Sequence, residues 1–207
     1  MATLKRSIIN IALTLVSFAF SSWFYEHYLM TYTHYISSYG VSFTLALNTI
    51  ITLILTYFTF ILIHLVYTKK ITSLTVAVSY FIYFMILIYV ILLKNIGIQG
   101  YSFNPLSFIS DFTSGSRFVP IMNLVMFIPL GFLFRPSKEN FILAFFGLLT
   151  IETAQYVFHL GIFDLGDVTL NLLSISIGTL LHQTALRKWL SQHITQKNNQ
   201  ILLKNLV

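Results

Sequence analysis

The chain has 207 residues, of which 57% are hydrophobic and only 9% are charged, whereas charged residues make up about a quarter of an ordinary soluble domain. This composition indicates a membrane protein, and the absence of cysteine excludes disulfides, thiolate nucleophiles and thiolate metal sites. The net charge of +6 does not indicate nucleic-acid binding, because the basic residues are scattered singly or in pairs between apolar runs.

Six apolar runs are long enough, or nearly so, for the roughly 20 residues that a membrane-spanning helix needs. In chain order they cover residues 7–25, 43–67, 73–93, 118–134, 140–159 and 168–186. The first follows Lys5 and Arg6 as in a secretory signal, but its apolar run exceeds such a signal's length and no small-x-small cleavage site follows it. We therefore expect it to be retained as a span.

The fourth run is short and is bounded by Pro120 and Pro136. Pro129 removes one backbone donor and Gly131 permits close packing, so we expect a kink here, in a segment that starts earlier or dips into the membrane. Within lipid only helices and closed barrels satisfy every backbone polar group, and these runs lack the alternation of barrel strands. The sequence predicts an all-α, polytopic helical bundle that forms a single membrane domain over residues 1–207.

The distribution of Lys and Arg predicts the orientation of the bundle. With six spans, ten of the twelve basic residues fall on one side of the membrane and two, Lys94 and Arg117, fall on the other. Both termini are therefore predicted to be cytoplasmic, with residues 187–207 as a cytoplasmic tail. The longest connection, residues 94–117, is predicted to lie on the outer surface, where it has the composition of an interfacial segment.

Polar residues of the last two spans fall on helical faces. Glu152, Gln155 and His159 are spaced i, i+3 and i+7 in the fifth span. Asp167, Asn171, Ser174 and Gly178 are spaced i, i+4, i+7 and i+11 in the sixth. The short connection makes the two spans antiparallel neighbours, and the small residues would let helices approach closely.

These polar residues also share a depth in the membrane. At ~1.5 Å per residue, Glu152 lies about 18 Å from the cytoplasmic end of the fifth span, in the outer half of the hydrocarbon core. We therefore predict that six residues converge on one polar site near the outer interface: Asn123, Glu152, Gln155, Asp164, Asp167 and Asn171. Ionisable groups inside spans usually face a bundle interior or a watery cavity.

Each residue also has a structural interpretation. Asp167 is equally suited to be the N-cap of the sixth span, and Asp164 to be a turn residue. Asn123 and Asn171 also suit interhelical hydrogen bonding. His159 suits an interfacial position. Glu152 is the hardest to explain without a function, although a neutral, hydrogen-bonded glutamic acid remains an alternative.

Familiar catalytic motifs are absent, including H-E-x-x-H, G-x-S-x-G and the P-loop. The spacing E-x-x-Q followed by D-x-x-D could assemble ligands for a divalent ion, but it is weak evidence by itself. We therefore assign no metal, no cofactor and no catalytic residue from the sequence.

Three segments together resemble the VanZ-like family of bacterial membrane proteins. They are "NLVMFIPLGFLFR" at 123–135, "IETAQ" at 151–155 and "FDLGDVTLN" at 163–171, and "NPLSFI" at 104–109 is similar to a loop that precedes them in the family. The resemblance covers residues 100–182. The chain departs from the family pattern at Gly161, where the family often has Arg, at Gly166, where it has an acidic residue, and at Ser174, where it has Gly.

The resemblance implies an integral protein of the bacterial cytoplasmic membrane, linked in some members to resistance to glycopeptide antibiotics such as teicoplanin. The leading hypothesis is a non-catalytic protein whose outward-facing site binds or masks a lipid, a lipid-linked cell-wall intermediate or a glycopeptide-related ligand. The alternative is an enzyme that modifies a lipid-linked substrate, with Glu152 as general base and Asp164 and Asp167 holding a metal ion.

Overall fold

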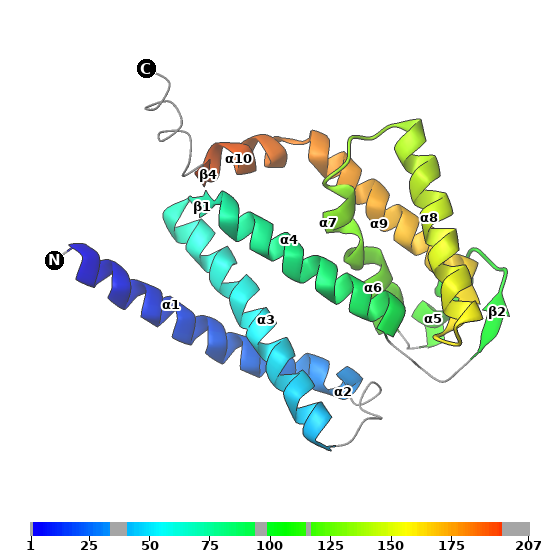
Figure 1. Ribbon diagram of the computed structural model, residues 1–207, viewed down its shortest axis with the longest axis horizontal. Helices are drawn as coiled ribbons and strands as arrows, with labels where there is room; N and C mark the ends of the chain where they lie inside the picture. Colours follow the sequence, from blue (N-terminus) through cyan, green and yellow to red (C-terminus); the bar gives the residue numbers. More distant parts are fainter. Residues whose placement is uncertain (1, 34–40, 94–98, 115–116, 196–207) are drawn as a thin grey trace. The chain divides into compact units, whose positions relative to one another are not determined.

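The computed structural model describes residues 2–33, 41–93, 99–114 and 117–195 (Figure 1). The chain divides into two compact units, one comprising Met1–Phe81 with the segment from His193, and the other comprising Ile82–Gln192. Long helices dominate both units, which confirms the predicted all-α class. The prediction of one membrane domain over the whole chain stays a prediction.

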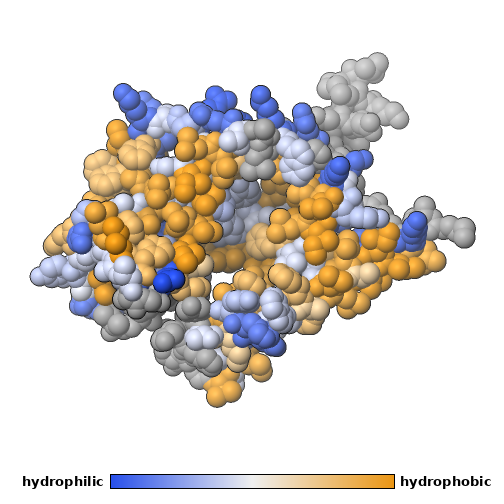
Figure 2. All heavy atoms as spheres, turned by 180° about the vertical axis from the view of Figure 1, so that it is seen from behind, coloured by the Kyte–Doolittle hydropathy of each residue, from blue (hydrophilic) through white to orange (hydrophobic). Residues whose placement is uncertain are grey.

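Five helical segments are long and apolar enough to cross a membrane, which confirms a membrane protein. They are formed by α1 (Ala2–Phe24) with its π-helical continuation η1 (Tyr25–Leu29), α3 (Val41–Thr68), α4 (Ser73–Ile88), α8 (Lys138–Val157) and α9 (Leu165–Gln183). Figure 2 shows that hydrophobic residues cover most of the face in view, while hydrophilic ones lie mainly toward its margins. Exposed apolar side chains on this scale are those expected of a surface in contact with lipid.

The fourth apolar run forms a pair of short helices, which agrees with the expectation of a short, kinked segment, and it is not among the five helices long enough to cross a membrane. Residues 118–134 form α6 (Phe118–Met126) and α7 (Ile128–Gly131), which meet at Phe127. At ~1.5 Å per residue the two helices together measure roughly 20 Å, less than the ~30 Å hydrocarbon core. Pro129 cannot donate a backbone hydrogen bond, which explains why the helix breaks just before it.

In the first unit, α1 packs along α3. Ser21 Oγ donates to Thr59 Oγ1 over 3.3 Å, and Tyr25 donates its hydroxyl proton to Asn48 Oδ1 over 2.5 Å. Two short strands, β1 (Ile71–Thr72) and β4 (Ile194–Thr195), pair in parallel. These two contacts pair polar side chains of one apolar helix with those of another, as expected where water is excluded.

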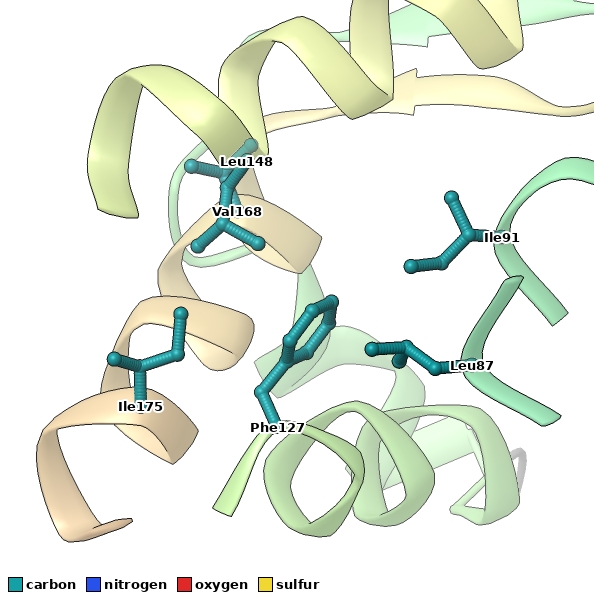
Figure 3. Close-up of a cluster of buried hydrophobic side chains, with 6 residues drawn as sticks. All are labelled: Leu87, Ile91, Phe127, Leu148, Val168 and Ile175. Atoms are coloured by element: carbon teal, nitrogen blue, oxygen red, sulfur yellow. The ribbon is translucent and has the colours of Figure 1, made fainter. Parts of the chain in front are cut away.

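The core of the second unit is built around Phe127, which is 2% exposed. Figure 3 shows its ring projecting into the middle of a buried cluster that contains Leu87, Ile91, Leu148, Val168 and Ile175. These residues come from α4, from the π-helix η3 (Tyr89–Leu93), from α8 and from α9. The break at Phe127 therefore places an aromatic side chain where four elements meet.

The helices α7 and α9 cross in very close contact. A Cβ atom built on Gly131 would overlap the carbonyl oxygen of Ile175, and one on Gly178 would overlap that of Ile128. The expectation that Gly131 and Gly178 permit close packing is confirmed. Ser174, one turn before Gly178, accepts a hydrogen bond from the backbone N–H of Phe127 over 3.1 Å. This hydroxyl therefore satisfies a donor at the break between α6 and α7.

Several short strands and helices complete the two units. The strands β2 (Gly100–Ser102) and β3 (Ile162–Asp164) pair in parallel, and α5 (Ser107–Ser114) packs against α9. The sequence had not predicted these strands. Beyond α9 come α10 (Ala185–His193) and β4, and in the first unit α2 (Met30–Thr33) follows η1. The predicted cytoplasmic tail thus starts as a helix, and residues 196–207 lie outside the described residues.

Candidate functional site

All six residues of the predicted polar site line one cavity of about 240 Å³ in the second unit. Asn123 comes from α6, Glu152 and Gln155 from α8, Asp164 from the end of β3, and Asp167 and Asn171 from α9. The convergence of these side chains is a feature of the structure. That they act together on a ligand stays a prediction.

Glu152 is the most enclosed acid of the site, at 4% exposed. Its Oε2 accepts a hydrogen bond from the backbone N–H of Asp164 over 3.4 Å, and its carboxyl interacts electrostatically with those of Asp164 and Asp167. Three carboxyls thus lie near one another in a largely apolar protein. Such an arrangement is expensive, because burial penalises each charge and like charges repel.

Asp164 organises the start of α9. Its Oδ1 accepts from Ser107 Oγ and from the backbone N–H of Gly166, both over 2.7 Å, so Asp164 is the N-cap of the helix. Asp167 lies in the first turn of α9 instead, which makes the interpretation of Asp167 as the N-cap wrong. Asp167 also lines the cavity.

Gln155 fixes the opposite wall of the cavity by donating from Nε2 to the backbone oxygen of Ile91 over 2.9 Å. Ile91 belongs to the π-helix η3, a geometry that departs from regular α-helical bonding. His159 does not share the face of Glu152 and Gln155, because α8 ends at Val157 and His159 adopts a left-handed conformation with φ 60°. The predicted i+7 relation fails where the helix stops.

Asn171 is 5% exposed and lines the cavity, and its Oδ1 has no hydrogen-bond partner among the described residues. Buried polar atoms are nearly always paired, so an unpaired amide oxygen beside a cavity indicates a site for a hydrogen-bond donor. The Oδ1 atom of Asn171 therefore does not support the interpretation of this residue as a hydrogen-bond link between helices. Asn123 on α6 lines the same cavity and is half-buried.

Sequence reasoning missed Asp111 among the lining residues, and it had noted Gly161 only as a departure from the family pattern. Asp111 from α5 and Gly161 from the turn before β3 both line the cavity. Asp111 could not be found from the sequence, because it shares no helix with the other acids of the site and lies far from them along the chain. Four of the six acidic residues of the chain thus border this cavity, and none of its described lining residues is basic.

Basic residues gather at the other end of α9. Arg135, Arg187 and Lys188 border a separate cavity with His182, whose Nδ1 hydrogen-bonds to the carbonyl oxygen of Phe132 over 2.7 Å. Asp167 and His182 are about 22 Å apart along the helix at ~1.5 Å per residue. Acidic residues at the start of α9 and basic residues near its end agree with the predicted orientation, in which the end of α9 is cytoplasmic. The orientation itself stays a prediction.

No group of three or more His, Cys, Asp or Glu side chains is arranged to hold a metal ion in the described parts of the chain. Asp164 already accepts two hydrogen bonds through Oδ1, and Asp167 also interacts with its surroundings. The cavity as built presents hydrogen-bond acceptors around an open space.

Replacing Gly166 with Ala should disturb the acidic end of α9. A Cβ at this position would overlap Ser107 Oγ and approach Asp164 Oδ1 to 3.1 Å. We expect a loss of about 1–2 kcal/mol of stability, measured as a lower midpoint of thermal unfolding in detergent. Because the overlap is with the Ser107 hydroxyl, Gly166→Ala should cost less in a Ser107→Ala background. Additive effects of the two substitutions would contradict this packing.

Comparison with known proteins agrees with the sequence motifs. The model of a family described as VanZ/LLP1 matches residues 50–186 of the chain. No curated protein and no solved structure matches the chain significantly. The matched region contains all six predicted site residues and extends the resemblance back to α3.

Proposed function

The chain belongs to the VanZ/LLP1 family, and we propose that it acts in the bacterial cytoplasmic membrane by binding or masking a lipid or cell-wall intermediate at its acidic cavity. The observation that carries this proposal is the convergence of Glu152 and Asn171, both almost fully buried, on one cavity with the other predicted residues. The proposed site faces the outer side of the membrane.

Burial of these groups supports binding over a purely structural role. Glu152 receives a single long hydrogen bond of 3.4 Å, and Asn171 Oδ1 receives none from the described residues. A buried acceptor without a partner lowers stability by about 1–3 kcal/mol. A protein that keeps such an acceptor beside a cavity gains stability when a ligand supplies the donor, because binding to the folded state shifts the folding equilibrium.

The proposed biological consequence concerns agents that act outside the membrane. The VanZ-like family is linked in some members to resistance to glycopeptides such as teicoplanin. A protein that sequesters a lipid or cell-wall intermediate at the outer surface would change the amount of that molecule that these agents can reach. We therefore propose that the cavity, and not the helical bundle alone, sets this susceptibility.

The decisive experiment compares Glu152→Ala with a matched control, Thr153→Ala, in a deletion strain. Thr153 is the neighbouring residue on α8, is exposed and lines neither the acidic cavity nor a described groove of this unit. We expect the Glu152 variant to return teicoplanin susceptibility to the level of the deletion strain, and the Thr153 variant to behave as wild type. Immunoblots of membranes should show equal abundance of all variants. Wild-type behaviour of both Glu152→Ala and Asp167→Ala would overturn the proposed site.

The same strains distinguish binding from catalysis. If the chain were an enzyme on a lipid-linked substrate, with Glu152 as general base, loss of Glu152 would change the chemical composition of the membrane lipids. Under the binding proposal, lipid analysis by mass spectrometry should give the same species in wild-type and Glu152→Ala strains. A lipid species that depends on Glu152 would favour the enzyme.

A further inference from the structure

A second cavity of about 260 Å³ lies in the same unit between α7, α8 and α9. Its walls are formed mainly by apolar residues, among them Leu130, Phe134, Phe141, Ala144, Gly147 and Ile175. The hydroxyls of Ser176 and Thr179, which also border it, donate to carbonyl oxygens of their own helix. The groove therefore presents an almost entirely hydrocarbon surface.

The apolar groove and the acidic cavity adjoin. Phe127 and Ile151 line both of them, and Ile151 is the residue next to Glu152. From Ile151 the groove follows α8 back to Asn140, a length of about 16 Å at ~1.5 Å per residue. It thus runs from the acidic cavity toward the predicted cytoplasmic end, the direction that the hydrocarbon chain of an outer-leaflet lipid takes.

The groove is open to lipid and has room. Leu143 on its wall is 69% exposed and Phe141 is 50% exposed. A Cβ built on Gly147, inside the groove, meets nothing within 4 Å. A ligand chain can therefore enter sideways from the membrane, and a larger side chain at position 147 would occupy the same space.

The charge of the acidic cavity selects the headgroup. Asp111, Glu152, Asp164 and Asp167 border it, no described lining residue is basic, and Asn171 Oδ1 adds an unpaired acceptor. A phosphate in this cavity would lie among carboxyl groups, and none of the described lining residues is basic. Hydroxyl or ammonium groups, which donate hydrogen bonds, match this lining.

We propose that the acidic cavity and the apolar groove form one binding site for an amphipathic lipid. Its headgroup carries hydrogen-bond donors, as a sugar or an amine does, and one of its hydrocarbon chains lies along α8 in the groove. This inference rests on the proposed function, since it takes the acidic cavity as the site, and it specifies the class of ligand.

The test uses the purified full-length protein in phosphatidylcholine vesicles and three photo-crosslinkable probes. The probes share one alkyl chain that carries a diazirine, and they end in glucose, in an amine or in phosphate. Mass spectrometry locates the crosslinks. We expect the glucoside, the amine or both to label groove residues on α8, and the phosphate to label them at least about tenfold less, because an anion would face the carboxyls.

Two substitutions on α8 separate the groove from the surface. Gly147→Phe fills the groove, whereas Thr153→Phe adds the same side chain on another face of the helix. Gly147→Phe should lower labelling about tenfold or more, since it occupies the space of the chain, and Thr153→Phe should leave it unchanged. Ala144→Phe provides a second groove variant, and size-exclusion chromatography confirms that each variant is folded.

The possible results distinguish this inference from the proposed function. If Glu152→Gln abolishes labelling and neither groove variant affects it, the groove is overturned while the acidic cavity stands. If neither class of variant affects labelling, both proposals fail. Equal labelling by the phosphate probe overturns the assignment of a donor headgroup. A dimer in size-exclusion chromatography that Gly147→Phe dissociates would show instead that a second copy occupies the groove.

Discussion

Replacing Gly178 with Val should destabilise the protein by about 2–3 kcal/mol, among the largest effects of any single change in α9. A Cβ at position 178 would overlap the carbonyl oxygen of Ile128 and approach Gly131 Cα to 2.8 Å. Both obstacles are backbone atoms of α7, so neither can rotate away as a side chain would. The helices would have to separate, which would also pull Phe127 from the centre of the core (Figure 3).

Thermal unfolding of the purified protein in detergent measures this effect. For a chain of this size the expected loss corresponds to a midpoint lowered by roughly 5–10 °C. Gly147→Ala is the matched control, because this glycine is also helical but a Cβ there meets nothing within 4 Å. The control should leave the midpoint unchanged or raise it slightly, since Ala favours a helix over Gly. A midpoint for Gly178→Val equal to that of the control would show that α7 and α9 do not cross as described.

Helical periodicity is the reason that the sequence predicted the polar residues of the cavity. In a helix, residues three, four and seven apart share a face, and this placed Glu152 beside Gln155 and Asp167 beside Asn171. The short connection between the two helices then made those faces neighbours. All of these residues line one cavity in the structure.

Periodicity fails where regular helix ends, and there the sequence predictions were wrong or absent. His159 was placed on the face of Glu152, but the helix stops at Val157. Asp164 and Asp167 are both suited to capping, and only the hydrogen bonds to Ser107 and Gly166 decide between them. Asp111 reaches the cavity from α5 through a tertiary contact that no local pattern encodes.

The departures from the family pattern have physical consequences in this chain. Ser174 supplies a side-chain acceptor for the N–H of Phe127 at the break between α6 and α7, which a glycine at this position would lack. Gly166 lies so close to Ser107 Oγ that an acidic side chain there would require that contact to change. Gly161 borders the acidic cavity without contributing a charge, so no cation stands at this position. Sequence comparison located these differences, but their consequences depend on tertiary contacts.

Replacing Asn171 with Leu should abolish the protein's effect on teicoplanin susceptibility. The same substitution should make the protein more stable. The two side chains branch at the same carbon, and Leu removes the buried Oδ1 that has no partner among the described residues. Removing an unsatisfied buried acceptor should raise stability by about 1 kcal/mol, or roughly 2–4 °C in the unfolding midpoint. The lost acceptor is also one that the proposed ligand needs, so susceptibility should return to the level of the deletion strain. Functional sites commonly trade stability for activity in this way.

The alternative interpretation of Asn171 as a structural hydrogen-bond partner between helices predicts the opposite change in stability. In that case Asn171→Leu would break an interhelical bond and lower the midpoint. Leu170→Ile serves as a control, because Leu170 is buried next to Asn171 but does not line the cavity. It should keep the phenotype and change stability by less than about 1.5 kcal/mol. If the Asn171→Leu protein is less stable and still alters teicoplanin susceptibility, Asn171 is not part of the binding site. Its role is then to hold helices of the bundle together.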